Sequence, residues 1–251
     1  MSGFFYNLGK KAGPHLRKAN WICQSLTGTE ANALEAEYQA GLGLAEEFKR
    51  QLPPDPDRSS AQILNKIGER LSACVTNKLR KFNFEVVLAP KPNAFALPGG
   101  FIFVSRPILE LCQWDQNQIA CILAHEMGHV IGQHAMDRII ARSAISITAR
   151  TFRTQGLLAG WLHKAGIQSL QCAYSQDQES EADELAVRLA KAAGYDPKAA
   201  IELFTRLGEL TKSSESDTFG EYFSTHPSFK LRIENIKKAL KKISPESESE
   251  K

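Results

Sequence analysis

Two histidines and a glutamate are spaced for metal-assisted hydrolysis in the stretch His125-Glu126-Met127-Gly128-His129. Residues four apart on a helix share one face, so His125 and His129 can hold one ion between two imidazole nitrogens. Glu126 lies beside them, where its carboxylate can take the proton of a water that the ion activates. The spacing therefore predicts attack of water on a carbonyl group. The plainer alternative is a pair of core histidines.

A catalytic zinc ion also needs a third protein ligand, and the place of that ligand distinguishes the classes of enzyme. In the pattern HExxHxxGxxH the third histidine would fall on Ala135, whereas His134 comes one residue early. A glutamate at the shorter thermolysin-like spacing would fall near Ala149, in a stretch without acids. The next acidic residues form a cluster at positions 177–184, which opens a predicted helix. The third ligand is therefore expected in that cluster.

Further motifs in the same order make the sequence resemble a known family. Glu179-Ser-Glu181-Ala182-Asp183 is similar to an ExEAD signature, and residues 93–100 are similar to an NAxAxPGG hairpin. His134 matches a histidine often found after HExxH, and Thr225-His226-Pro227 with the later Arg232 matches a downstream element. Over about residues 60–240 the chain thus resembles the CAAX-prenyl-protease/HtpX/BepA-like zinc metallopeptidases, as a soluble member without their membrane helices.

The resemblance implies one Zn²⁺ per chain, held by His125, His129 and Glu179. Asp183, one turn after Glu179, is expected to hydrogen-bond the second nitrogen of His125 and so fix its orientation. His134 is expected to lie in the shell around the ligands, and Glu181 to be solvated or paired. Two alternatives stay open here. Glu179 can be a surface carboxylate favoured by the helix dipole, and His134 can lie on the helix surface.

The catalytic residues that the resemblance implies are Glu126, His226 and Arg232. His226 is expected to stabilise the oxyanion of the tetrahedral intermediate, or to cover the open metal position at rest. Arg232 is expected to orient His226 or the ligand glutamate. The alternative for His226 is an ordinary turn residue before a proline. An extended substrate is expected to add to the free edge of the strand formed by Asn93, Ala94, Phe95, Ala96 and Leu97.

The surrounding pattern predicts an α+β fold, predominantly helical, with one small sheet beside the HExxH helix. The resemblance implies that this fold is of the gluzincin type. Apolar spacing predicts helices over about 30–51, 59–77, 115–140, 179–193 and 228–242. Asp115 is a good N-cap for the metal helix. A strand is expected over 84–88. The sequence Pro98-Gly99-Gly100 predicts a hairpin turn between two further strands.

Three regions are expected along the chain. They are an N-terminal helical arm (1–57), a catalytic domain (58–243) and a disordered tail (244–251). Residues 1–29 and 138–176 are basic stretches, each without an acidic residue. For each, a peripheral contact with an anionic membrane surface and ordinary packing with solvated charges are competing hypotheses. The segment 138–176 can also contact a partner chain.

The composition narrows the class of protein. The chain has 251 residues, 31 Lys and Arg against 28 Asp and Glu, and a net charge of +3, which is too mild to suggest a nucleic-acid ligand. Five widely spaced cysteines favour free thiols, and neither a secretory signal peptide nor a transmembrane stretch is readable. These features predict a cytoplasmic location. They leave the oligomeric state and the cleavage preference open.

We therefore expect a zinc-dependent metalloendopeptidase that cleaves protein or peptide substrates, with a role in protein quality control. The competing hypothesis is a non-catalytic, zinc-stabilised module that acts like a chaperone or binds a membrane surface. A purely structural zinc site would favour cysteine ligands and would have no use for Glu126 as a base.

Overall fold

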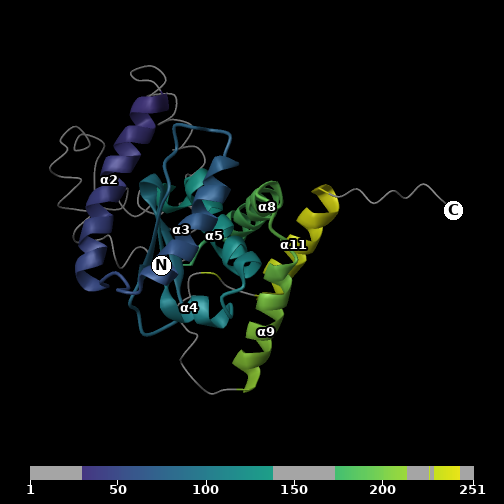
Figure 1. Ribbon diagram of the computed structural model, residues 1–251. Helices are drawn as coiled ribbons and strands as arrows, with labels where there is room; N and C mark the ends of the chain where they lie inside the picture. Colours follow the sequence, from purple (N-terminus) through teal and green to yellow (C-terminus); the bar gives the residue numbers. More distant parts are fainter. Residues whose placement is uncertain (1–29, 138–172, 214–225, 227–228, 244–251) are drawn as a thin grey trace, which may run out of the picture.

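The computed structural model describes residues 30–137, 173–213, 226 and 229–243, which form a mostly helical molecule with one small sheet (Figure 1). This arrangement confirms the predicted α+β class. The helices are α2 (Glu30–Gln51), α3 (Arg58–Ala73), α4 (Arg106–Leu111), α5 (Gln116–Ile131), α8 (Gln176–Ala192), α9 (Ala199–Ser213) and α11 (Phe229–Ile243).

The sheet has three strands in the order β1-β3-β2, with β1 (Asn83–Val87) parallel to β3 (Phe101–Ser105). Strand β2 (Ala94–Leu97) runs antiparallel to β3 and lies at the edge of the sheet. A short 3₁₀ turn at Pro98–Gly100 joins β2 to β3. Gly99 and Gly100 both have positive φ, 75° and 88°, a conformation that side chains disfavour. The predicted hairpin is therefore present, and the positive φ angles explain why glycine occupies both positions of its turn.

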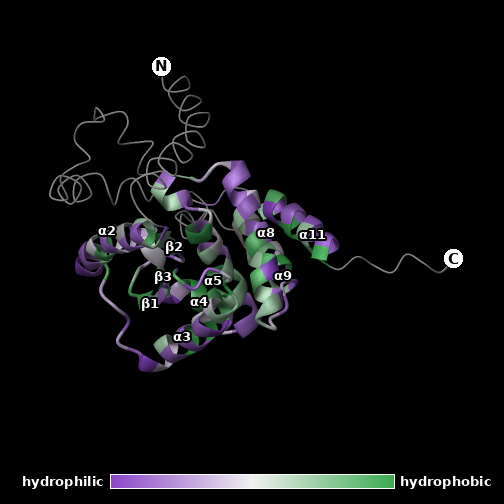
Figure 2. Ribbon diagram, turned by 90° about the horizontal axis from the view of Figure 1, so that it is seen from above, coloured by the Kyte–Doolittle hydropathy of each residue, from purple (hydrophilic) through white to green (hydrophobic). Residues whose placement is uncertain are grey.

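The sheet separates two apolar cores because successive residues of β3 point to opposite faces. Phe101 and Phe103 belong to the core under α2, whereas Ile102 and Val104 belong to the core built with α3, α5, α8, α9 and α11. In Figure 2 α2 lies on one side of the sheet, and α3, α5 and α8 lie on the other. Helix α2, expected in an N-terminal arm, thus covers one face of the sheet.

Helix α5 lies at the centre of the larger core, and all its residues from Gln118 to Val130 are buried. It packs against α3, α8, α9 and β2. Its approach to α8 is close at Gly128, where an added Cβ would lie 2.9 Å from the carbonyl oxygen of Ala182. Asp115 caps its first turn by accepting hydrogen bonds from the amides of Asn117 and Gln118, at 2.8 and 3.0 Å.

Two predicted helix boundaries that follow the metal-binding motif are wrong. Helix α5 was expected to reach about residue 140 but ends at Ile131, because Gly132 closes its last turn and Gln133 adopts a positive φ of 56°. A separate helical turn follows at 134–137. Helix α8 begins at Gln176 rather than near 179, because Ser175 forms a capping box with Gln178.

Several predicted features lie outside the described residues. They include the N-terminal stretch 1–29, nearly all of the basic segment 138–176, the tail 244–251, and Thr225 and Pro227 beside His226. Within the part of the chain that is described, no helix has both the length and the apolar character to cross a membrane.

Candidate metal centre

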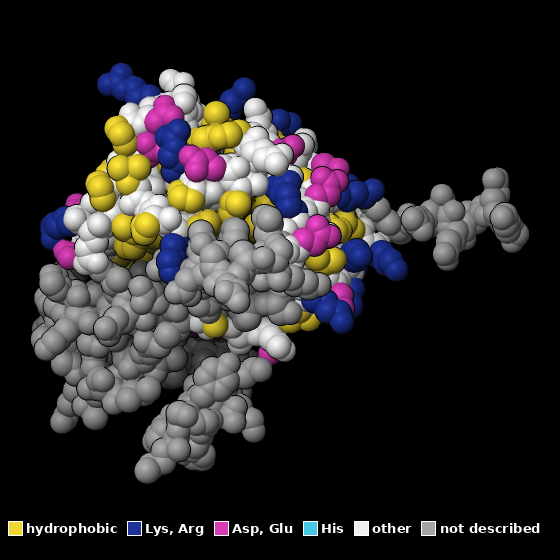
Figure 3. Space-filling view, turned by 90° about the horizontal axis from the view of Figure 1, so that it is seen from below, with side chains coloured by type: hydrophobic (Ala, Val, Ile, Leu, Met, Phe, Trp, Pro, Cys, Tyr) yellow, Lys and Arg dark blue, Asp and Glu magenta, His cyan; other side chains and the backbone are white. Residues whose placement is uncertain are grey.

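The two histidines of the HExxH motif lie on one buried face of α5. Their Nε2 atoms are 3.0 Å apart, and the side chains of His125 and His129 are 1% and 0% exposed. On the face drawn in Figure 3, the described surface mixes both signs of charge with apolar side chains and shows no histidine. The predicted i,i+4 spacing thus directs two imidazole nitrogens to a single point inside the molecule.

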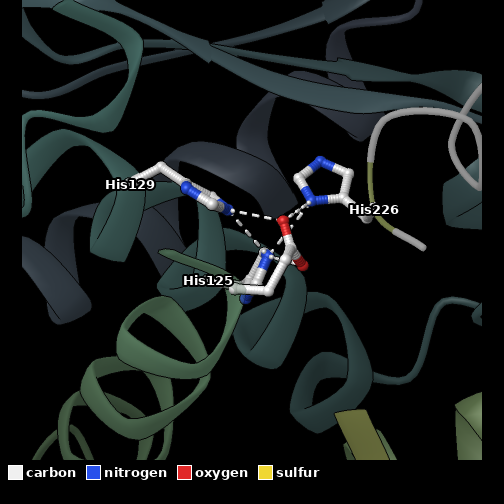
Figure 4. Close-up of side chains that lie close together, drawn as sticks. His125, His129 and His226 are labelled. Carbon is white, nitrogen blue, oxygen red and sulfur yellow. Dashed lines mark hydrogen bonds and ion pairs between the residues drawn. The ribbon is translucent and has the colours of Figure 1, made fainter. Parts of the chain in front are cut away.

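Glu179 and His226 come to the same point from other parts of the chain. Glu179, in the first turn of α8, places its carboxylate oxygens 3.5 Å from His125 Nε2 and 3.4 Å from His129 Nε2. His226 Nδ1 lies 2.9 Å from Glu179 Oε1 and 3.3 Å from His125 Nε2. Figure 4 shows the three histidine rings converging. One donor atom from each of the four residues lies within 4.8 Å of the others.

This donor set fits a divalent metal ion. Zinc–nitrogen bonds of about 2.0–2.1 Å in a tetrahedral site place neighbouring ligand atoms roughly 3.3 Å apart, close to the separations found here. Glu179 Oε2 is buried and has no hydrogen-bond partner among the described atoms. A buried carboxylate oxygen without a hydrogen-bond partner is costly unless a cation is bound nearby. Imidazole and carboxylate donors together are a set that zinc commonly uses.

Glu126 lies beside this cluster without joining it. Its side chain is fully buried, and neither carboxylate oxygen has a hydrogen-bond partner among the described residues. One oxygen is 3.5 Å from His226 Nε2. The carboxylate is thus held next to the ligand atoms, with both oxygens available to accept a proton.

Asp183 and Arg232 fix His125 through Nδ1, the ring nitrogen that does not face the cluster. Asp183 Oδ1 lies 3.0 Å from His125 Nδ1 and accepts two hydrogen bonds from Arg232, at 3.1 and 2.9 Å. The resemblance placed Arg232 against His226 or the ligand glutamate. Arg232 donates to Asp183, and its guanidinium also lies 3.8 Å from Glu179, the glutamate expected as a ligand. These contacts favour a positioning role for Arg232, which stays a prediction. Its cation also lies 4.4 Å from the centre of the Phe204 ring.

The buried charges shift one another's pKa values. Burial and Arg232 disfavour the charged form of His125, but Asp183 and Glu179 outweigh them and raise its pKa to about 9. Burial lowers the pKa of His129 well below its usual value. Burial opposes ionisation of Glu179 and Asp183, yet the neighbouring histidines and Arg232 keep both pKa values lowered. Both carboxylates are therefore ionised at neutral pH, as metal and histidine partners require.

His134 and Tyr174 surround the second histidine. The Nδ1 atoms of His129 and His134 are 2.9 Å apart, and His134 Nε2 lies 3.3 Å from Glu181. The ring of Tyr174 stacks on His129 with centroids 3.7 Å apart. The sequence analysis missed Tyr174. Its position directly before the N-cap Ser175 was the available signal, because such a residue lies at the entrance to the helix that carries Glu179.

The strand proposed for substrate lies next to the metal helix. Strand β2 packs against α5 and is an edge strand of the described sheet. Ala94, Ala96 and Leu97 are buried in the two cores, and Phe95 stacks on Phe103 under α2. Asn93 donates its backbone N–H to Ser105 Oγ at 2.7 Å. The side chains of β2 therefore anchor the strand in the fold. An added substrate strand would pair with the backbone of β2 at this edge of the sheet.

Comparison with known proteins assigns the class. Residues 58–240 match peptidase family M48, and the chain belongs to this family. This result confirms the metallopeptidase resemblance drawn from the motifs. The match begins at the start of α3 and ends within α11, so it includes all the residues of the metal centre.

Individual relatives carry related names. The chain is 34% identical over 168 residues to "Mitochondrial metalloendopeptidase OMA1" of Schizosaccharomyces pombe, covering 64% of this chain and 47% of that protein. It is 24% identical over 234 residues to "Beta-barrel assembly-enhancing protease" of Yersinia pestis, covering 87% and 47%. It is 26% identical over 183 residues to "Metalloprotease LoiP" of Escherichia coli, covering 70% and 67%. The chain thus spans about half the length of the first of these relatives.

The names of four relatives contradict the predicted cytoplasmic location. These proteins, from Schizosaccharomyces pombe, Arabidopsis thaliana, Saccharomyces cerevisiae and Bos taurus, are named as mitochondrial. The prediction failed because it tested the N-terminus only for the pattern of a secretory signal peptide. Mitochondrial targeting follows a different, basic and acid-poor pattern that this test does not address.

Proposed function

We propose that this chain is a zinc-dependent metalloendopeptidase that hydrolyses peptide bonds within protein substrates. The observation that carries the proposal is the convergence of His125, His129 and Glu179 beside the buried carboxylate of Glu126. A purely structural metal site has no need of a buried carboxylate that makes no hydrogen bond to the described residues. Membership of peptidase family M48 supports the same reaction.

The three proposed ligands are oriented for the metal by their neighbours. His125 donates its Nδ1–H to Asp183, so the lone pair of Nε2 faces the cluster. Arg232 holds Asp183 in place and keeps it ionised. His134 supports His129 in the corresponding way. When bound, a zinc ion supplies Lewis-acid polarisation of the scissile carbonyl and a lower pKa for the attacking water.

Glu126 acts as the general base in this proposal. Its carboxylate accepts the proton of the attacking water and later delivers a proton to the leaving amine, as a positioned acid–base group does. Full burial keeps bulk water from solvating this carboxylate. The substrate lies extended along the edge of β2, residues 93–97, and pairs with its backbone. Because β2 packs on α5, such a strand passes close to the metal helix.

His226 has two candidate roles, and the geometry favours one. Its Nδ1 stands at ligand spacing from His125 and Glu179, while its Nε2 lies 3.5 Å from Glu126. A catalytic zinc site keeps one position open for water or substrate. His226 lies among the ligand atoms that border this position, so we propose that the described arrangement is a resting one. During turnover a displaced His226 is free to donate to the oxyanion.

A second candidate function is a closed, zinc-stabilised binding module. The convergence of four donor residues at one point favours it, because four protein ligands around one ion are typical of a structural metal site. The names of the relatives favour the enzyme, since they include "metalloendopeptidase" and "assembly-enhancing protease". A role in protein quality control is the biological setting that these names suggest for the chain.

The variant Glu126→Gln separates the two functions. It keeps the shape of the side chain and removes its basicity, so metal content measured by elemental analysis should match the wild type. Hydrolysis of a casein-type substrate should fall by at least about a hundredfold, the low end for loss of a positioned base. Loss of zinc would make Glu126 a ligand instead of a base. Undiminished hydrolysis with zinc in place would refute its proposed role.

A further inference from the structure

A line of three side chains runs from the proposed metal site to the protein surface. His129 Nδ1 contacts His134 Nδ1 at 2.9 Å, and His134 Nε2 contacts Glu181 Oε2 at 3.3 Å. His134 is fully buried, whereas the side chain of Glu181 is 55% exposed. The line crosses from the end of α5 to α8, the helix that also carries Glu179.

The hydrogen-bonding capacity of the rings allows one arrangement that satisfies every link. A neutral imidazole has one N–H donor and one acceptor nitrogen. If His129 Nε2 offers its lone pair to a metal, its Nδ1 carries the proton and donates to His134 Nδ1. His134 must then carry its own proton on Nε2, where Glu181 accepts it. A carboxylate at the end of the line thus selects the tautomer of both rings.

The backbone is shaped to place His134 in this line. After α5 ends at Ile131, Gln133 adopts a positive φ of 56°, which is uncommon for a residue other than glycine. This reversal brings the His134 ring over Gly132, where an added Cβ would lie 2.5 Å from Nε2. Tyr174 also confines His129 by stacking on its ring. Local backbone strain of this kind is retained where the surrounding structure requires it.

We propose that Glu181 is a positioning residue for the metal site, acting through His134 to orient the ligand His129. This inference rests on the proposed function, because it assumes that His129 binds the metal. Glu181 then has for the second ligand the role that Asp183 has for the first. The two differ in environment, since Asp183 is buried and paired with Arg232 while Glu181 faces solvent. Loss of Glu181 should therefore weaken zinc binding less than loss of Asp183.

The test measures zinc affinity by competition with a chelator and the visible spectrum of the cobalt-substituted protein. Loss of an outer partner of a metal ligand typically costs about 10–100-fold in affinity, so Glu181→Ala should weaken zinc binding by about tenfold. It should also shift the cobalt bands. Glu181→Gln should largely restore both, because the amide oxygen can still accept from His134.

The matched control is Glu184→Ala, which removes the same charge one turn further along α8. Glu184 pairs on the surface with Arg188 and Lys242, so this variant should bind zinc like the wild type. In His134→Asn, the amide oxygen can accept from His129 without reaching Glu181. Adding Glu181→Ala to that variant should cause no further loss. An additional tenfold loss would refute a path through His134.

The outcomes separate this inference from the proposed function. Unchanged zinc affinity and an unchanged cobalt spectrum in Glu181→Ala, with normal thermal unfolding of the metal-free protein, would overturn the positioning role. A wild type that binds zinc and shows the Glu181 effect but cleaves no peptide would sink the proposed function alone. A wild type that binds no zinc would refute both.

Discussion

Each proposed histidine ligand owes its orientation to a second side chain behind it. His125 contacts the buried carboxylate of Asp183, which Arg232 holds in turn. His129 contacts His134, which contacts the partly exposed carboxylate of Glu181. Burial strengthens the contacts of His125 with Asp183 and of His129 with His134, because water cannot compete for the donors. The same burial means that removing the metal leaves several charges close together with little solvent to screen them. The chemistry of the metal-free protein should therefore differ sharply from that of the loaded one.

The metal-free protein should lose stability as the pH rises. His125 has its pKa raised to about 9 by Asp183 and Glu179, which outweigh burial and Arg232. A raised pKa in the folded state adds stability that is complete below about pH 6.5 and is lost as the pH passes about 9. The shift corresponds to a loss on the order of 3 kcal/mol.

This loss is measurable by urea unfolding with chelator between pH 6 and 10. The variant His125→Asn is the control, since it has no proton to release and should show a flatter profile. A wild type whose unfolding free energy stays constant over this range would contradict the assignment of a protonated His125.

Replacing His226 should activate the enzyme. In the structure its ring borders both the ligand atoms and Glu126, where water and the substrate carbonyl must come during catalysis. We expect His226→Ala to raise the initial rate of peptide hydrolysis severalfold while zinc binding weakens. A loss on the order of a hundredfold in turnover, with zinc retained, would instead identify His226 as the oxyanion donor.

At the scale of elements, the site exists because α5 and α8 approach closely enough for their side chains to meet. Gly128, between Glu126 and His129 in the metal motif, is where the two backbones nearly touch: an added Cβ would lie 3.0 Å from the Cα of Ala182. A small residue at such a crossing sets the distance between the helices. That distance in turn sets how far Glu179 reaches toward the two histidines.

Gly128→Ala should therefore weaken both folding and zinc binding. Forcing the helices apart at a packed crossing typically costs about 1–3 kcal/mol, which a urea titration measures directly. The matched control is Gly43→Ala in α2, where no atom lies within 4 Å of the added Cβ. That change should leave zinc affinity alone and stabilise the helix by roughly 0.5–1 kcal/mol. Equal effects of the two variants would show that the crossing at Gly128 is unimportant.

The sequence was most informative where a short spacing decides the geometry. Helical periodicity located α2, α3 and α5, and the i,i+4 rule brought His125 and His129 to one face. The end of α5 was missed because Gln133 takes a positive φ that its residue type does not signal. The stacking of Tyr174 and the hydrogen bonds of Arg232 to Asp183 were also missed. Such contacts depend on how distant elements pack, and the spacing of residues within one segment does not reveal that.

At the scale of the molecule, the two apolar cores relate differently to the proposed zinc site. The larger core joins α5, α8, α9 and α11, the helices around the metal-binding residues. The smaller core lies beyond the sheet, between its outer face and α2. A bound ion would connect α5 to α8 directly, because it takes His125 and His129 from one and Glu179 from the other. The stabilisation should therefore be uneven across the fold.

Hydrogen exchange with and without zinc should reveal this unevenness. Amides that exchange only when α5 separates from α8 gain protection from the ion, by about a hundredfold at a hundred times the dissociation constant. This slowing should appear in the last two turns of α5 and the first two of α8. Amides of α2 and β1, beyond the metal-binding helices, should exchange at nearly the same rate. Glu179→Ala should abolish the zinc effect, whereas Glu126→Gln should keep it. Uniform slowing across the chain, α2 included, would instead mean that the two cores unfold as one unit.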